Sequence, residues 1–202
     1  MDPIEKLSEE FTKFPGIGPR QARRFAYYVL SQSKENHETL VSAMSVLRKD
    51  VAQCPSCFVY FTRRNNEPEC KECRDIGRNK TTLLVVEKDI DLQTVEKSRV
   101  YDGYYFVLGG MVPLHEQTPT SKVRIQELVK RVRKMLESGL KEVVVALAAT
   151  QEGDHTYSYV QAVLKQVAPD LSVSILGRGL STGTEIEYAD PNTLSQAFSN
   201  RK

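Results

Sequence analysis

Four cysteines constrain the fold of this chain more than any other feature of its sequence. They form two C-x-x-C pairs separated by 12 residues. Each pair can place two thiolates on one tetrahedral ion, and a closed site of four thiolates suits structural Zn²⁺. So short a segment cannot bury a core of its own, so the metal would supply its folding energy. A redox dithiol and two disulfides are the alternatives. The pattern favours a zinc site with these ligands: Cys54, Cys57, Cys70 and Cys73.

The order of patterns along the chain predicts a multi-domain α+β protein. Residues 1–53 read as helical, with no strand-like run. Residues 54–78 form the cysteine segment, which has room for a small hairpin between its two pairs. Residues 79–178 alternate short apolar strands with helical patterns, which indicates a mostly parallel sheet. Residues 179–202 form a tail with a short helix.

The α/β region contains four apolar runs that we predict to be strands: 82–87, 104–110, 142–150 and 171–177. The third run is continuously apolar from Val143 to Ala149, which is typical of the middle of a parallel sheet. Helical spacing predicts helices over 121–138 and from about Thr156 to Val167. In the tail, Asp190 followed by Pro191 predicts an N-cap and the first position of the final helix.

A glycine-rich turn precedes a basic helical stretch in FPGIGPRQARRF, residues 14–25. A Gly-Ile-Gly turn lets the backbone approach a phosphate without a Cβ in the way, and a helix N-terminus offers N–H groups and partial positive charge. An apolar stripe at helical spacing would face inward and leave the arginines outside. An inter-helix turn with a solvated basic face is the alternative. The pattern favours backbone contacts to DNA by six residues: Lys13, Gly16, Gly18, Arg20, Arg23 and Arg24.

Charge is distributed unevenly, although the net charge is only +2. Residues 1–80 carry 14 Lys/Arg and 11 Asp/Glu, whereas residues 81–202 carry 14 and 15. From Phe11 to Lys34 there are five basic residues and no acidic residue. A local patch of this kind can hold a polyanion. Further arginines in the cysteine segment could either touch nucleic acid or form a solvated surface: Arg63, Arg64, Arg74 and Arg78.

The composition is that of an ordinary globular protein, with 40% hydrophobic and 27% charged residues. No apolar run approaches the ~20 residues that a membrane span needs. The acidic N-terminus lacks the apolar core of a signal peptide. We therefore expect a cytoplasmic protein that makes no membrane contact.

Acidic residues follow two of the predicted strands. Glu87 ends the first strand, and Glu152 and Asp154 follow the third. The carboxyl ends of strands in an open α/β sheet converge on one crevice, where carboxylates could hold Mg²⁺. Solvated acids or salt-bridge partners are the alternative. The pattern resembles the Toprim domain of topoisomerases and primases, in which a glutamate is followed by D-x-D. Because Glu152 replaces the first aspartate, we do not expect catalysis there.

The whole sequence resembles the RecR family of bacterial recombination mediators. The resemblance runs nearly end to end and rests on the glycine turn, on the cysteines with CRDIGRN, and on LLVVEKDIDL, YYFVLGGMVPLH, ATQEGDHTYSYV and GRGLSTGTEIEYADPNTLSQAF. It implies four parts: a helix-hairpin-helix domain (1–53), a zinc module (54–78), a Toprim domain (79–178) and an oligomerisation segment (179–202).

The resemblance also implies a function without catalysis. RecR proteins form ring-like tetramers able to encircle DNA, and they act with RecO and RecF to help load RecA onto coated single-stranded DNA. It links the helix-hairpin-helix region to DNA binding and subunit contacts, the Toprim region to RecO and RecF, and the C-terminal segment to ring closure. Binding to single- and double-stranded DNA would be independent of sequence. A Mg²⁺-dependent nuclease or primase-like nucleotidyl transferase, and a zinc-ribbon adaptor that binds only proteins, are the alternatives.

Overall fold

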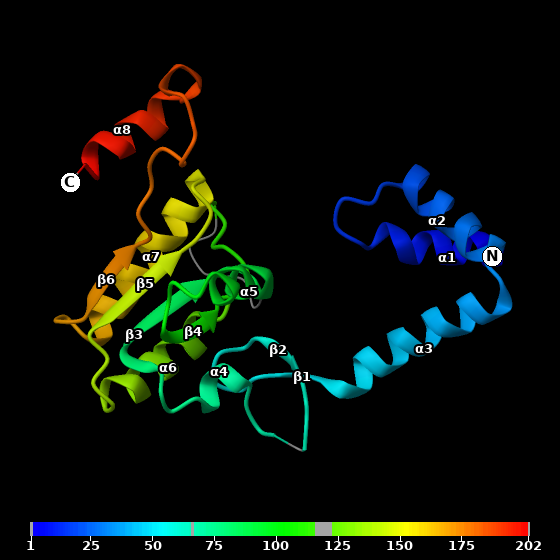
Figure 1. Cartoon of the computed structure of the whole chain (residues 1–202), viewed down its shortest axis with the longest axis horizontal. Helices are drawn as coiled ribbons and strands as arrows, with labels where there is room; N and C mark the ends of the chain where they lie inside the picture. Colours follow the sequence, from blue (N-terminus) through cyan, green and yellow to red (C-terminus); the bar gives the residue numbers. More distant parts are fainter. Residues whose placement is uncertain (1, 66, 116–122, 202) are drawn as a thin grey trace. The chain divides into compact units, whose positions relative to one another are not determined.

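The computed structural model describes residues 2–65, 67–115 and 123–201, and Figure 1 traces their elements in chain order. The chain divides into two compact units, Met1–Val51 and Ala52–Lys202. Within the described parts, no helix is long and apolar enough to cross a membrane.

The first unit is built from three helices, α1 (Pro3–Thr12), α2 (Pro19–Ser31) and α3 (Lys34–Asp50). Helices α1 and α2 pack against each other through the predicted apolar stripe. Phe11 of α1 meets Phe25 of α2 edge to face, with ring centroids 5.8 Å apart. The small residues of the stripe on α2 are fully buried, which allows the two helices to approach closely.

A four-stranded parallel sheet forms the centre of the second unit. Its strands are β3 (Asn79–Val86), β4 (Gly103–Val107), β5 (Glu142–Ala146) and β6 (Ser172–Ile175), in the spatial order β4-β3-β5-β6. The four predicted strands are confirmed. The third, β5, is an interior strand as expected, because a continuous apolar run suits a strand that is covered on both faces.

Helices cover both faces of this sheet. Helices α6 (Ile125–Leu136) and α7 (Gln151–Val167) pack on one face, and α5 (Asp89–Ser98) packs on the other. Helix α6 falls within the predicted range 121–138, of which residues 121 and 122 lie outside the described part of the chain. Helix α5 was not predicted, because its ten residues carry a weak apolar pattern with only one fully buried side chain.

Successive side chains of each strand point to opposite faces of the sheet, so the second unit has two separate hydrophobic cores. In β3, Leu83 and Val85 point to the face that α6 and α7 cover. Leu84 and Val86 point to the other face, where they pack with Leu92 of α5 and with the cysteine segment. The cysteine segment therefore shares a core with the sheet and is one of its covering layers.

Two short strands frame the first cysteine pair. Strand β1 (Val51–Gln53) pairs with β2 (Tyr60–Thr62), and helix α4 (Lys71–Arg74) carries the last cysteine. The prediction of no strand within residues 1–53 was therefore wrong at its end. The hairpin lies around the first C-x-x-C pair, since the turn at that pair brings the chain back beside β1.

Helix α7 begins at Gln151, five residues before the predicted start. The side chain of Thr150 caps it by accepting a hydrogen bond from the Gly153 backbone N–H at 3.1 Å. Glu152 and Asp154 therefore stand in the first helical turn, where the helix dipole favours negative charge. The sequence analysis began this helix only after the Glu-Gly-Asp stretch, and glycine is indeed a poor helix former.

The tail contains a 3-10 turn (Ile186–Tyr188) and helix α8 (Pro191–Ser199). The predicted N-cap is confirmed: a side-chain oxygen of Asp190 accepts hydrogen bonds from the first-turn N–H groups at 2.9 and 3.0 Å. The Thr193 hydroxyl also donates to the Asp190 carboxylate at 2.6 Å. That bond first, and then the backbone bonds, lower the pKa of Asp190, because they favour its carboxylate form.

We predict that Gly153→Ala destabilises the second unit. A Cβ at this position would stand 2.0 Å from the backbone oxygen of Ala148, so the chain entering α7 would have to shift. Overpacking of this kind costs about 1–3 kcal/mol, whereas helix propensity alone would stabilise by about 1 kcal/mol. Thermal unfolding of the wild type and of the Gly153→Ala protein shows whether the substitution lowers or raises the stability.

The matched control is Gly177→Ala, because a Cβ there meets no atom within 4 Å. We expect the control to unfold at the wild-type temperature. A Gly153→Ala protein as stable as the wild type would contradict the close contact with Ala148.

Candidate functional site

The four cysteine sulfurs gather at one point. All four Sγ atoms lie within 4.8 Å of one another. The Sγ atoms of Cys57 and Cys70 are 3.5 Å apart. A tetrahedral ion with bonds of about 2.3 Å needs sulfurs about 3.8 Å apart. The donor set and its spacing therefore fit a tetrahedral metal ion, and Cys73 is the one member of the four with partial exposure.

The crowded sulfurs favour a cation electrostatically. The neighbouring Cys54 sulfur, then the other cysteines and burial, raise the pKa of Cys57. The Cys54 sulfur also raises the pKa of Cys70, with help from Cys73 and burial and against the effect of Cys57. Hydrogen bonds from the neighbouring thiols lower the pKa of Cys54. Four thiolates at this spacing repel one another, and a divalent metal removes that repulsion by binding all four.

Tight turns bring each pair of cysteines together. After Cys54 the chain folds back, so that the N–H of Phe58 donates to the Cys54 carbonyl at 2.9 Å. Phe58 takes a left-handed conformation with φ 65°, which closes this turn. Cys70 precedes α4, and its carbonyl accepts from the Arg74 N–H at 3.2 Å. Cys73 therefore lies one helical turn away, on the same side.

Backbone and aromatic contacts fasten the cysteine segment to the sheet. The N–H of Val107 in β4 donates to the carbonyl of Cys57 at 2.8 Å. Phe58 packs edge to face on Phe106, with ring centroids 5.4 Å apart. The guanidinium of Arg124 lies 5.2 Å from the Phe58 ring centre. The cysteine cluster and the sheet thus form one connected structure.

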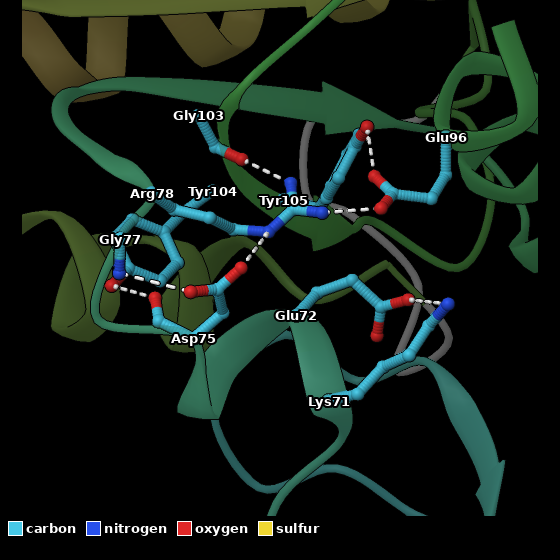
Figure 2. A network of polar contacts seen from close by, with 9 residues as sticks. All are labelled: Lys71, Glu72, Asp75, Gly77, Arg78, Glu96, Gly103, Tyr104 and Tyr105. Carbon is cyan, nitrogen blue, oxygen red and sulfur yellow. Dashed lines mark hydrogen bonds and ion pairs between the residues drawn. The ribbon is translucent and has the colours of Figure 1, made fainter. Parts of the chain in front are cut away.

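Arg78 links the end of the cysteine segment to the sheet (Figure 2). Its guanidinium donates to the Gly103 carbonyl at 2.8 Å and pairs with Glu96 of α5. It also lies 5.3 Å from the centre of the Tyr105 ring. With only 11% of its side chain exposed, Arg78 is a structural residue and fits neither of the two alternatives that the sequence left open, contact with nucleic acid or a solvated surface. Arg74, in turn, pairs with Glu67 at 2.9 Å.

The hydroxyls of two tyrosines in this region are also held by hydrogen bonds within the fold. The hydroxyl of Tyr101 donates to the Tyr104 carbonyl at 3.0 Å, and the hydroxyl of Tyr105 donates to Glu96 at 2.8 Å. Burial raises the pKa of Tyr101 to about 12. Burial and the Glu96 carboxylate raise the pKa of Tyr105. Both phenols are therefore poor nucleophiles at neutral pH.

The glycine turn of the first unit has the features expected of a phosphate-binding hairpin. Gly16 has φ 75°, which disfavours a side chain, and a Cβ at Gly16 or Gly18 would meet open space. Gly18 is the N-cap of α2 and offers no side-chain cap, while Pro19 lacks an N–H. The N–H groups of Arg20 and Gln21 are therefore free of an N-cap side chain and lie at the positive end of the helix dipole.

Basic side chains surround this turn. Arg20, Arg23 and Arg24 are all exposed on α2, on the side away from the buried stripe. Lys13 differs, because its ammonium pairs with Glu10 at 2.7 Å. The predicted set therefore comes together around one turn, with the charge of Lys13 partly offset.

The three acids of the predicted crevice have separate surroundings. Glu87 pairs with Lys88 at 2.8 Å, and Asp154 pairs with Arg178 at 2.7 Å. Glu152 is exposed. Among the described residues, only the cysteines bring three or more possible ligand atoms within 4.8 Å of one another. Two of the acids thus act as salt-bridge partners, which is the alternative that the sequence left open.

Two arginines, one at the start of α6 and one within it, contact the cysteine segment and were not predicted from the sequence. Arg124 covers Phe58, and Arg131 donates to the sulfur of Cys73 at 3.9 Å. Neither residue belongs to a motif. Arg124 is more than fifty positions from Phe58, and Arg131 is more than fifty positions from Cys73. Only the packing of α6 beside the cysteine segment brings these residues together.

Comparison with known proteins places these features in one family. The model described as RecR, helix-hairpin-helix, matches residues 4–47, the Toprim domain model matches 81–177, and the model described as RecR, C-terminal, matches 179–202.

Three relatives, each named Recombination protein RecR, match nearly end to end. The protein of Synechococcus sp. (strain CC9605) is 36% identical, over 98% of this chain and 99% of its own. That of Enterococcus faecalis (strain ATCC 700802 / V583) is 35% identical, over 100% and 97%. That of Synechococcus sp. (strain CC9311) is 38% identical, over 97% and 98%. With its glycine turn, its cysteine cluster and its parallel sheet, this chain belongs to the RecR family of recombination proteins.

Proposed function

We propose that this protein is a cytoplasmic, non-enzymatic recombination mediator that binds DNA and acts with RecO and RecF to help load RecA onto single-stranded DNA. The observation that carries the proposal is the uncapped, glycine-bordered N-terminus of α2 with three exposed arginines beside it, in a chain of the RecR family. Each of the four parts of the chain would have the role that the family resemblance implies for it.

The glycine turn would hold the DNA backbone. Phosphate oxygens can accept from the free N–H groups at the start of α2, while Arg20, Arg23 and Arg24 supply positive charge. Such contacts carry no base information, so binding would be independent of sequence for single and double strands. One copy with a net charge of +2 would bind weakly. A ring of copies would multiply affinity by ~10²–10⁴.

Exposed apolar residues in the first unit support self-association. Tyr28 and Leu30 of α2 are 64% and 67% exposed, and Met44 and Leu47 of α3 are 61% and 65% exposed. A cavity of about 410 Å³ opens between these helices and α1. Exposed apolar surface of this kind marks protein contacts. We therefore propose that these helices form a subunit interface of a homotetrameric ring.

The cysteine cluster would hold structural Zn²⁺. Cys54, Cys57, Cys70 and Cys73 would supply four thiolates and leave no open position for substrate. When bound, the ion supplies cross-linking and charge neutralisation, and no chemistry on DNA. The protein residues then keep the segment folded against β4.

The acids of the sheet favour a contact role over catalysis. A nuclease of the Toprim type needs carboxylates that converge on Mg²⁺, and here Glu87 and Asp154 pair with Lys88 and Arg178. We propose that this edge serves RecO or RecF and does no phosphoryl transfer.

We predict that changing Arg20, Arg23 and Arg24 together to alanine weakens DNA binding at least tenfold. If each arginine meets one phosphate, the slope of log K against log salt falls by about 2 for single strands, from about 0.7 per contact. Mobility shift across a salt series measures both quantities, and circular dichroism checks the fold.

Two further proteins test this assignment. A charge-matched control replaces three exposed lysines of the second unit with alanine: Lys97, Lys141 and Lys165. We expect it to bind like the wild type. Gly18→Ala keeps every charge and has room in the fold, so any loss of affinity comes from the Cβ in the path of the phosphate. Equal affinity of the arginine variant and the wild type would refute the DNA site.

We also predict that DNA strands incubated with the protein and Mg²⁺ remain intact and unextended. Denaturing gels with single- and double-stranded substrates, with and without nucleotides, measure this. The control for contaminating nuclease is Glu87→Ala. Cut or extended strands that disappear in the Glu87→Ala protein would make the acids catalytic and overturn the mediator proposal.

Metal analysis of the purified protein should find about one zinc ion per chain. We predict that Cys70→Ser lowers the zinc content and the unfolding temperature of the second unit, because the sulfur cluster forms part of the sheet core. Chelation of the wild type should do the same, and added Zn²⁺ should restore the original melting curve. Wild-type protein that contains no zinc, and that melts unchanged in chelator, would falsify the zinc site.

A further inference from the structure

The side chain of Arg131 lies against the metal centre from outside the cysteine segment. It projects from α6, and its Nη2 donates to Sγ of Cys73 at 3.9 Å. Its guanidinium also lies 5.5 Å from the centre of the Tyr104 ring. The hydroxyl of Tyr104 in turn donates to the carbonyl of Asp75, two residues after Cys73, at 3.1 Å. Arg131 is thus held in place between the sheet and the sulfur.

The charge of this arginine suits a tetrathiolate centre. Four thiolates and one Zn²⁺ carry a net charge of −2, and three of the sulfurs are buried. A net charge in a poorly solvated site is costly unless a counter-charge accompanies it. Arginine remains protonated at any pH at which the protein folds, so it always supplies that charge. Among the described residues, Arg131 is the only side chain, apart from the cysteines themselves, that donates a hydrogen bond to a cysteine sulfur.

Arg131 also stands at the accessible side of the cluster. A cavity of about 180 Å³ reaches Cys73, and its lining includes Arg131, Tyr104, Lys80 and Lys134. Cys73 is the partly exposed member of the four cysteines. A chelator or an oxidant that attacks the metal centre through this cavity meets Arg131 beside the sulfur.

We propose that Arg131 is a positioning residue of the zinc centre: its N–H holds the thiolate of Cys73, and its charge compensates the tetrathiolate. The inference rests on the zinc site proposed above. It predicts that loss of Arg131 makes the metal leave faster, starting at Cys73. Outer-shell partners of metal ligands typically change metal affinity by about 10–100-fold.

The test compares zinc release from three full-length variants with that from the wild type, using a chromogenic chelator in excess. Arg131→Met keeps an aliphatic side chain over Tyr104 but removes the charge and the donors. Arg131→Lys keeps the charge without the planar donor group. Lys134→Met is the matched control. Lys134 is exposed and lines the same cavity, and this substitution removes the same charge.

We expect Arg131→Met to release zinc about tenfold faster than the wild type. Lys134→Met should release it at the wild-type rate, and Arg131→Lys should fall between the two. Equal rates for Arg131→Met and Lys134→Met would overturn the inference. Wild-type protein without zinc would instead refute the proposed zinc site, so the two failures are distinguishable.

A spectrum separates a direct role from a structural one. In protein loaded with Co²⁺, the sulfur-to-metal charge-transfer band reports the electron density on the thiolates. Loss of a hydrogen bond to Cys73 raises the energy of the sulfur lone pairs, so the band of Arg131→Met should move to longer wavelength. A general loosening of the fold would broaden the band or lower its intensity without that shift. An unshifted band in a folded, cobalt-loaded Arg131→Met protein would also contradict the proposal.

Discussion

The contact between the cysteine segment and one face of the parallel sheet is the constraint on which the second unit depends. Leu84 and Val86 of β3 pack against the same cluster that contains three of the cysteines. Helix α5 covers only part of this face, so the cysteine segment must cover the rest. The segment has only a four-residue helix and a two-stranded hairpin of its own. Whatever holds the four sulfurs together therefore also keeps apolar sheet surface out of water. A metal in this position would stabilise a core that is much larger than the segment itself.

The candidate site of the first unit is built from residues that are close together in the sequence. The features proposed to contact DNA are local in sequence: Gly16 and Gly18 shape the turn, Pro19 starts the helix, and the arginines follow within two turns. The burial of one stripe of α2 against α1 fixes which residues remain outside. A site built in this way needs no long-range contact to form, whereas its strength depends on how many copies act together.

This difference explains how much of the protein could be predicted from its sequence. The cysteine cluster, the interior strand β5 and the capping by Asp190 were predictable because each has its pattern in one continuous stretch of sequence. The start of α7 was missed because Thr150 caps it against the weak helix propensity of Gly153. The role of Arg78 was misjudged for a different reason. A charged residue near the cysteines suggests a surface, and only the arrival of Gly103 and Glu96 from distant elements buries it.

Under the function proposed above, the sheet edge of a fold associated with catalysis would recognise a partner instead of turning over a substrate. In a phosphoryl-transfer site the carboxylates must be free to share a cation. Here Lys88 follows Glu87 directly in the chain, and Arg178 follows β6 closely enough to reach Asp154. Each cation neutralises a carboxylate that a metal would otherwise need, and Mg²⁺ would have to displace it. The same charged pairs remain accessible in part, with 57% of the Asp154 side chain exposed. Exposed ion pairs of this kind contribute little to stability, but they can be exchanged for pairs with a partner protein. The acids therefore suit recognition of a partner better than turnover of a substrate.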